Sequence, residues 1–351
     1  MTSVLALLDI QLPIIQAPMA GVSTPAMAAA VSRAGGLGSL GVGAMSVDAA
    51  RGAIGEARAR GAGPLNVNVF VHQPTAPNPA KELAWIERLR PEFERYGASP
   101  PSGLADIYQS FLKDDAMLAM LLVEKPTVVS FHFGVPLPAQ LNALRGAGII
   151  LMASATSLSE ARQLTAAGID VVIAQGHEAG GHRGLFDPGV PDDQLSCPAL
   201  TRILVRRLDR PVIAAGGMMD GAGIGAALRL GAGAAQLGTA FIDTPESLAD
   251  EAFRAALTGE PGHHTVMTRA ISGRPARCMA NRFTALGAAI GDDVVPSYPR
   301  AYDLGKALHA AAKARGEFGY GAQLAGQGAP LSRAMPTEQL VRTLAQEVKA
   351  V

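Results

Sequence analysis

Short runs of apolar residues alternate along the chain with longer stretches in which apolar positions recur at helical spacing. The runs cover residues 13–17, 37–40, 65–70, 128–131, 149–153, 171–175, 212–215 and 235–238. Strands that alternate with crossover helices are typical of a parallel sheet. Because nearly every position of these runs is apolar, we expect both faces of the sheet to be covered. Eight strands favour an α/β fold of the (β/α)8 TIM-barrel type over an open doubly wound sheet.

The helical stretches carry recognisable ends. Ser157, with Glu160 in the first turn, predicts the start of one helix, and Gly231 predicts the end of another. The spacing between strands is regular except at two places, about 72–126 and from about 244 to the end. The first of these contains seven prolines and is too long for a single crossover helix. We therefore expect a barrel of residues 1–72 and 127–245, covered by a smaller, mainly helical lid of residues 73–126 and 246–351.

Composition narrows the classes of function. Hydrophobic residues make up 48% of the 351 residues and charged residues 17%, which allows a large buried core. The 30 basic and 30 acidic residues cancel, so nothing in the charge favours nucleic acid or a membrane as partner. The two cysteines and the lack of a signal-peptide pattern predict a reduced, cytoplasmic protein. Low net charge favours weak self-association, so we expect a monomer or a weak homodimer.

Two glycine-containing turns at the ends of the last two strands predict a phosphate site. Gly216 and Gly217 follow the seventh strand, and Gly238 and Thr239 follow the eighth, directly after Gln236. In TIM barrels this is the usual position for phosphate, because glycines let backbone N–H groups approach the anion. A requirement for tight turns alone is the alternative explanation.

Other strand ends offer a place for a flat ring. Ala17, Pro18 and Met19 follow the first strand and combine small residues with a proline. Asn68 lies in the third strand and Gln175 at the end of the sixth. Because an amide side chain in a buried strand needs a hydrogen-bond partner, the polar edge of a bound ring is a candidate partner for both. An ordinary loop explains the first feature equally well.

The segment after the sixth strand carries a resemblance to a known family. It reads Gln-Gly-His-Glu-Ala-Gly-Gly-His-Arg-Gly over residues 175–184 and includes Gly180, Gly181 and His182. Together with the segments above, which span residues 14–242, it resembles the nitronate monooxygenases, formerly called 2-nitropropane dioxygenases. The resemblance implies an FMN cofactor bound by Ala17, Pro18, Met19, Asn68, Gln175, Gly180, Gly181, Gly216, Gly217, Gln236, Gly238 and Thr239. It also implies oxidation of a small nitronate by O2 to a carbonyl compound and nitrite.

A more detailed pattern resembles the first class of that family, whose preferred substrate is propionate 3-nitronate. The class pattern of one Asn, one Tyr, two His, two Tyr and one Lys matches Asn68, Tyr108, His132, His182, Tyr298, Tyr302 and Lys306. The last three are spaced four apart, which keeps them near one face of a helix that we expect Ser297 to cap. A lysine and phenols on one face suit a small dianion. From periodicity alone, a solvated helix is the simpler interpretation.

His182 and His132 are the candidate catalytic residues, since both lie at strand ends. Histidine exchanges protons near neutral pH and also donates hydrogen bonds. If the substrate is a neutral nitroalkane, His182 is the candidate base that removes the α-proton. If it is the nitronate anion, no base is needed and His182 binds the anion or tunes the flavin. We favour the binding role, and a structural histidine is the alternative for both residues.

Three other functions share parts of this pattern. An NAD(P)H-dependent FMN reductase of enoyl thioesters carries a similar loop around His182, but the face of Tyr298, Tyr302 and Lys306 argues against it. A phosphate-binding sensor would hold no flavin. A barrel similar to inosine-monophosphate dehydrogenase needs a nucleophilic cysteine after the sixth strand, and neither Cys197 nor Cys278 has that setting. No complete set of metal ligands surrounds His263–His264 or Asp292–Asp293, so we expect no metal.

Overall fold

A ring of eight parallel strands forms the centre of the computed structural model, which describes residues 3–351. The strand order is β1-β9-β8-β6-β5-β4-β3-β2, and a parallel bridge between Ile15 and Leu37 joins β1 to β2 and closes the ring. The strands are β1 (Ile14–Gln16), β2 (Gly38–Gly41), β3 (Leu65–Phe70), β4 (Val128–His132), β5 (Ile150–Ala155), β6 (Val171–Gln175), β8 (Val212–Ala215) and β9 (Ala234–Leu237). The predicted TIM barrel is confirmed.

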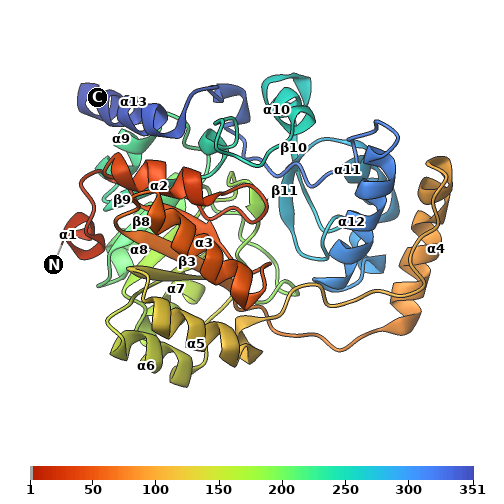
Figure 1. Cartoon of the computed structure of the whole chain (residues 1–351), viewed down its shortest axis with the longest axis horizontal. Helices are drawn as coiled ribbons and strands as arrows, with labels where there is room; N and C mark the ends of the chain where they lie inside the picture. The colour runs from red at the N-terminus through yellow and green to blue at the C-terminus, as the bar shows by residue number, and fades with distance from the viewer. Residues whose placement is uncertain (1–2) are drawn as a thin grey trace.

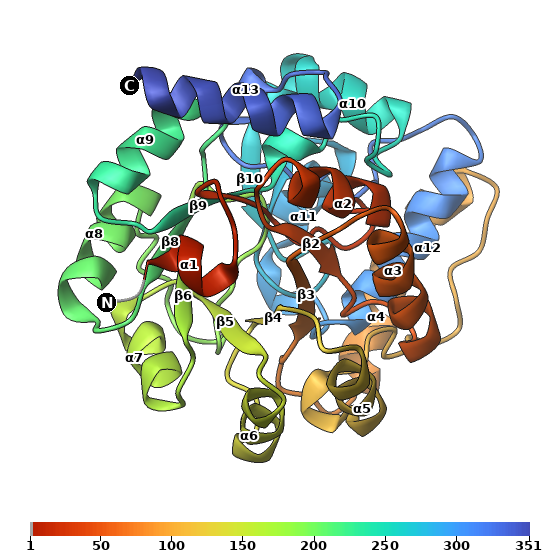
Figure 2. The ribbon, with the colours of Figure 1, turned by 60° about the vertical axis from the view of Figure 1, so that its left-hand side comes forward.

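Each barrel strand is followed by a helix that packs on the outside of the ring (Figures 1 and 2). These helices are α2 (Pro25–Arg33), α3 (Val47–Ala59), α5 (Asp115–Glu124), α6 (Pro138–Gly146), α7 (Leu158–Ala166), α8 (Cys197–Arg207), α9 (Gly221–Arg229) and α13 (Thr337–Ala350). The predicted helix ends are confirmed. Ser157 accepts a hydrogen bond from the backbone N–H of Glu160 at 3.2 Å, and Gly231 follows α9 with a φ of 101°.

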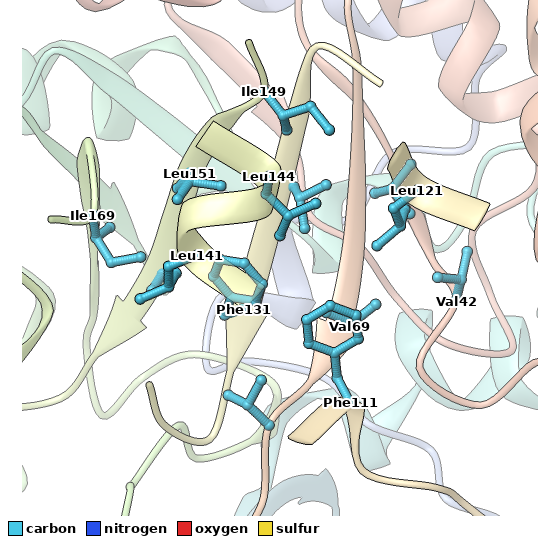
Figure 3. Packing of buried hydrophobic residues seen from close by; sticks show 14 of the residues in the cluster. Val42, Val69, Phe111, Leu121, Phe131, Leu141, Leu144, Ile149, Leu151 and Ile169 are labelled. Atoms are coloured by element: carbon cyan, nitrogen blue, oxygen red, sulfur yellow. The ribbon is translucent and has the colours of Figure 1, made fainter. Parts of the chain in front are cut away.

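The barrel has an outer and an inner core. Between the strands and the outer helices, Val69 and Phe131 pack against residues such as Phe111, Leu121 and Leu141 (Figure 3). Inside the ring, the short helix α1 (Val4–Leu8) covers the end at which the strands begin and packs against the strand side chains (Figure 2). The amino ends are thereby closed, so any open site must lie at the carboxyl ends of the strands.

Two helices belong to the barrel although the expected division of the chain put them in the lid. Met117 and Leu121 of α5 join the core beneath β3 and β4, and Leu340 and Leu344 of α13 pack beside α2 and α9. Each long segment therefore supplies one barrel helix as well as part of a second layer. The reason is physical: each barrel strand must bury its outer face, and these two helices cover β3 and β9.

The second layer lies over the carboxyl ends of the strands and is mainly helical. It contains α4 (Pro79–Arg95), α10 (Glu251–Thr258), α11 (Arg282–Ile290) and α12 (Arg300–Lys313), seen on the right and top of Figure 1. Its core joins Trp85 and Leu89 of α4 to Leu304 and Leu308 of α12. Five short 3-10 helices connect the elements: η1 (Phe111–Lys113), η2 (Thr239–Phe241), η3 (Glu260–His263), η4 (Asp292–Val294) and η5 (Ala329–Leu331). Among residues 3–351, no helix is long and apolar enough to cross a membrane.

A small antiparallel sheet, which the sequence analysis did not predict, ties this layer to the barrel. Its order is β10 (Thr265–Thr268), β11 (Ala276–Met279) and β7 (Gly181–His182). In the pairing of β11 with β7, Ala276 faces His182 and Arg277 faces Gly181. The loop after β6 is thus fixed to the C-terminal half of the chain.

The place of α13 in the barrel can be tested by stability. Leu344 is fully buried, so we expect Leu344→Ala to lower the free energy of unfolding by about 2–5 kcal/mol through lost burial and a residual cavity. The exposed Gln346 on the same helix provides the control, and Gln346→Ala is expected to stay within about 0.5 kcal/mol of the parent. Urea unfolding measures both. Equal stabilities of the two variants would show that α13 is not part of the barrel core.

Candidate active site

A cavity of about 610 Å³ lies between the carboxyl ends of the barrel strands and the second layer. Every residue predicted for the site lines this one cavity. They are Ala17, Pro18, Met19, Asn68, Tyr108, His132, Gln175, Gly180, Gly181, His182, Gly216, Gly217, Gln236, Gly238, Thr239, Tyr298, Tyr302 and Lys306. The structure therefore brings together positions that lie almost 290 residues apart in the sequence.

One end of the cavity is lined by backbone amides. Gly216 and Gly217 follow β8 with φ values of 128° and 71°, a conformation that glycine adopts without strain. Gly238 follows β9, and η2 begins at Thr239. Within residues 3–351, the N–H groups of Gly217, Gly238 and Thr239 donate to no other group. Unpaired amides that converge at a strand end form a suitable site for an anion.

The side-chain amides at the barrel mouth differ in how many of their polar atoms have a hydrogen-bond partner. Asn68 donates from Nδ2 to the carbonyl oxygen and to Oγ of Ser130, at 3.1 and 2.9 Å. Gln236 lines the cavity with an Oε1 atom that is buried and has no donor among the described residues. A buried acceptor without a partner costs free energy, so a bound group that carries an N–H would satisfy it.

Gln175 holds the loop that carries His182. Its Nε2 donates to the carbonyl oxygen of His182 at 3.0 Å, and its Oε1 accepts from the backbone N–H of Gly184 at 2.7 Å. His132 adds a third contact, since its Nε2 lies 3.1 Å from the same His182 carbonyl oxygen and must donate to it. Both side chains therefore position the loop as well as lining the cavity.

The His182 ring is held from the second layer. Its Nε2 lies 2.8 Å from Oγ of Ser272, in the hairpin between β10 and β11. The rings of Tyr298 and Tyr302 meet it edge-on, with centroids 5.6 and 6.1 Å away. Burial lowers the pKa of His182 to about 3 and that of His132 to about 4. At neutral pH both imidazoles are uncharged, and His182 is a weak base.

The lysine and the tyrosines form the opposite wall. The centroids of Tyr298 and Tyr302 lie 6.2 and 5.7 Å from that of Tyr108, and Nζ of Lys306 lies 5.0 Å above the Tyr108 ring. Within residues 3–351, no carboxylate lies within ion-pair distance of Lys306. Burial raises the pKa of both Tyr298 and Tyr302, so these phenols stay protonated and can donate hydrogen bonds. This wall therefore suits an anion.

One prediction about this wall was wrong. Helix α12 begins at Arg300 with Pro299 at its N-cap position, and the side chain of Ser297 caps nothing. Tyr298 consequently precedes the helix, and only Tyr302 and Lys306 share its face. Packing of the Tyr298 ring against His72 and His182, rather than helical spacing, brings it into the cavity.

Sequence reasoning missed several segments of the wall, among them 41–45, 248–253 and 321–328. Residues 321–328, between α12 and α13, line the cavity without forming regular structure. The close approach explains a glycine: a Cβ atom on Gly180 would lie 2.4 Å from the backbone nitrogen of Gly326. Glycine richness at 316–328 was the available signal, but glycine runs alone do not indicate which loop they contact.

The comparisons with known proteins agree on one family. The sequence profile of the family described as nitronate monooxygenase matches residues 2–347. A protein of Paraburkholderia phytofirmans named nitronate monooxygenase is 60% identical over 347 residues, covering 99% of this chain and 95% of that protein. One of Pseudomonas aeruginosa with the same name is 51% identical, with 98% of each chain covered.

Solved structures share the fold. The nitroalkane oxidase from Streptomyces ansochromogenes superposes with a TM-score of 0.90 at 41% identity, covering 98% of both chains. FabK from Thermotoga maritima is similar at a lower level, with a TM-score of 0.77 and 30% identity over 100% of this chain and 97% of that one.

The buried histidines predict how stability depends on pH. Burial lowers the pKa of His72 to about 4, as it does for His132, from an ordinary value of 6.5. Below pH 6.5 these histidines bind a proton in the unfolded chain but remain unprotonated in the native state. Their contribution to the free energy of unfolding is therefore fully present above pH 6.5 and is lost as the pH falls toward 4. Urea unfolding at pH 7, 6 and 5 should show this decline.

His72→Gln should make the decline shallower, whereas the same change at exposed His264 should leave it unaltered. A free energy of unfolding that is equal at pH 7 and pH 5 would contradict the buried, uncharged state of these rings.

Proposed function

Because this chain belongs to the nitronate monooxygenase family, we propose that it oxidises propionate 3-nitronate with FMN and molecular oxygen, giving a carbonyl compound and nitrite. It is an oxidoreductase that acts on a small molecule, and its family relatives support oxidation of nitronates in general. One observation supports the choice of FMN as cofactor and propionate 3-nitronate as substrate. A single cavity has unpaired backbone amides at one end and an unpaired lysine among protonated phenols at the other.

The amide-lined end fits the phosphate of FMN. Gly217, Gly238 and Thr239 offer three N–H groups without protein acceptors among the described residues, and two of these three residues have no side chain. A Cβ atom on Gly238 would lie 3.4 Å from Cβ of Ala17 and 3.5 Å from Sδ of Met19, in ordinary contact with both. Glycine at this position leaves that space free for a ligand.

The barrel mouth fits the flavin ring. The unsatisfied Oε1 of Gln236 offers an acceptor for the ring N–H, and the small segment Ala17–Pro18–Met19 offers a flat apolar contact. Asn68 and Gly180–Gly181 border the same space. When bound, FMN supplies the redox chemistry, and the protein supplies position and electrostatics.

The lysine wall fits the substrate. Propionate 3-nitronate carries a carboxylate and a nitronate, and Lys306 offers the positive charge for one of them. Tyr108, Tyr298 and Tyr302 offer hydroxyl donors that bind an anion better than they bind a neutral molecule. His182 is proposed to contact the nitronate as an uncharged hydrogen-bond partner, whereas His132 borders the site and holds the loop, since its single N–H is used by the His182 carbonyl oxygen. A base with a pKa of about 3 removes a proton from carbon poorly, which favours the preformed anion over a nitroalkane as substrate.

The main alternative is an NAD(P)H-dependent FMN reductase of enoyl thioesters. It would use the same barrel and a similar His182 loop, but it needs space for a nicotinamide and for an acyl chain. An unpaired cation among phenols suits a small dianion better than an apolar acyl chain.

The direct test is oxygen consumption by the purified protein. With propionate 3-nitronate we expect oxygen uptake matched by nitrite release, and with NADPH alone no oxidation. Oxidation of NADPH without turnover of the nitronate would instead establish the reductase alternative.

Lys306 is the residue through which the substrate assignment can be tested. We expect Lys306→Met to raise KM for propionate 3-nitronate about tenfold or more, since it removes the charge that meets the carboxylate. For an alkyl nitronate that lacks a carboxylate, the rise should be much smaller. Lys349→Met is the control, because Lys349 is exposed on α13 and does not line the cavity.

Equal effects of Lys306→Met on both substrates would contradict the assignment of Lys306 to the carboxylate.

A further inference from the structure

A buried arginine without a carboxylate partner lies behind the two candidate histidines. Arg274 is 4% exposed and belongs to the hairpin between β10 and β11. Its Nη2 donates to the carbonyl oxygens of Leu185 and Phe186, and its Nε is buried with no hydrogen-bond partner among the described residues. The side chain does not line the cavity. Sequence reasoning had no signal for this residue, because nothing in its local pattern marks it as buried.

No negative charge neutralises this guanidinium at close range. Within residues 3–351, no carboxylate lies within 4.0 Å of it; the acidic groups that act on it from farther away are Asp187 and Glu160. Glu160 is already engaged, since it accepts hydrogen bonds from Thr156 and from the backbone of Phe186. Arg269 adds a second positive charge nearby. By contrast, the equally buried Arg183 pairs with Asp192 at 2.8 Å. Burial of an unpaired charge costs several kcal/mol of stability. A charge that is kept at this cost is a candidate for a functional role.

Phe133 lies between this charge and the cavity. The guanidinium carbon of Arg274 lies 4.3 Å from the centroid of the Phe133 ring, within the range of a cation–π contact. The same ring lies 4.4 Å from the His132 ring and 5.7 Å from the His182 ring. Phe133 has a φ of 80°, a left-handed conformation that costs a bulky residue on the order of 1–3 kcal/mol. The surrounding contacts hold the ring there in spite of that cost.

We propose that Arg274 is an electrostatic positioning residue of this cavity: its unpaired charge, held against the Phe133 ring, strengthens the binding of an anion in front of His132 and His182 and disfavours a second positive charge on these rings. The identity of that anion as a nitronate rests on the proposed function. The effect on the histidines does not.

The charges around the two rings agree with this role. After burial, the causes that lower the pKa of His182 are His132 and then Arg274, and Arg274 and Arg183 lower the pKa of His132. Arg274 also lowers the pKa of neighbouring His72, where Asp106 opposes it. The other titratable groups that face His182 are the phenols of Tyr298 and Tyr302, which burial keeps protonated.

A fixed cation has an advantage over a protonated histidine. An arginine remains charged throughout the physiological pH range, so the potential that it creates does not change with pH. The imidazoles then remain available as hydrogen-bond partners. Anion binding should consequently depend little on pH between 6 and 9.

Two substitutions separate the charge of Arg274 from its hydrogen bonds. Arg274→Gln keeps an amide that can donate to a carbonyl oxygen but removes the charge, and Arg274→Lys keeps the charge. Arg254→Gln is the control, because Arg254 also donates to two backbone carbonyl oxygens but is paired with Asp243. Histidine ring titrations are followed by NMR in the full-length, flavin-loaded protein, and KM and kcat are measured with propionate 3-nitronate.

In the parent, His132 and His182 should remain uncharged at pH 5. Arg274→Gln should raise the pKa of these rings by about half a unit or more, while Arg274→Lys and Arg254→Gln leave them unchanged. Arg274→Gln should also raise KM about threefold to tenfold with a smaller change in kcat. Titration of the parent rings near 6.5, equal titration in Arg274→Gln and the parent, or an equal shift in Arg274→Lys would each overturn the proposal. If Arg274→Gln does not fold, the comparison of Arg274→Lys with the parent still tests whether the charge, and not the guanidinium shape, sets the behaviour of the rings.

The two proposals fail in different ways. If the pKa values of the histidine rings shift as expected but neither the parent nor any variant oxidises the nitronate, the proposed function is wrong and the electrostatic role of Arg274 stands. If the nitronate is oxidised and the rings are insensitive to Arg274, only the role of Arg274 is lost.

Discussion

The pairing of Gly181–His182 with β11 is the constraint on which the site depends. It joins a loop of the barrel to a hairpin almost 100 residues later in the chain, and that hairpin carries Ser272 and Arg274. The pairing orients the His182 ring, brings the second layer over the barrel mouth and encloses the cavity. Gly180 permits it, because a side chain at that position would collide with the backbone at Gly326.

The electrostatics of the cavity follow from what surrounds it. Burial keeps two histidines and two tyrosines uncharged, while Lys306 and the more distant Arg274 contribute positive charge without a paired carboxylate. Such a cavity stabilises negative charge, whether that charge arrives with the substrate or develops during oxidation. Membership of the nitronate monooxygenase family and this excess of positive charge lead to the same class of substrate.

Strong local patterns made much of this predictable. The eight barrel strands are mostly apolar, and parallel strands place their carboxyl ends together, so residues at those ends converge on one cavity. The strands β10 and β11 escaped prediction because Thr265–Thr268 and Ala276–Met279 form neither a continuous apolar run nor a clear alternation of apolar and polar positions. The barrel roles of α5 and α13, the start of α12 after Tyr298 and the burial of Arg274 depend on tertiary packing, which no local pattern encodes.

The most direct measurement is the absorption spectrum of the purified, flavin-loaded protein on mixing with propionate 3-nitronate without oxygen. We expect the nitronate to abolish the absorption of the oxidised flavin within the time of turnover, and NADPH under the same conditions to leave it unchanged. Loss of the absorption with NADPH and none with the nitronate would rule out nitronate oxidation as the activity of this cavity.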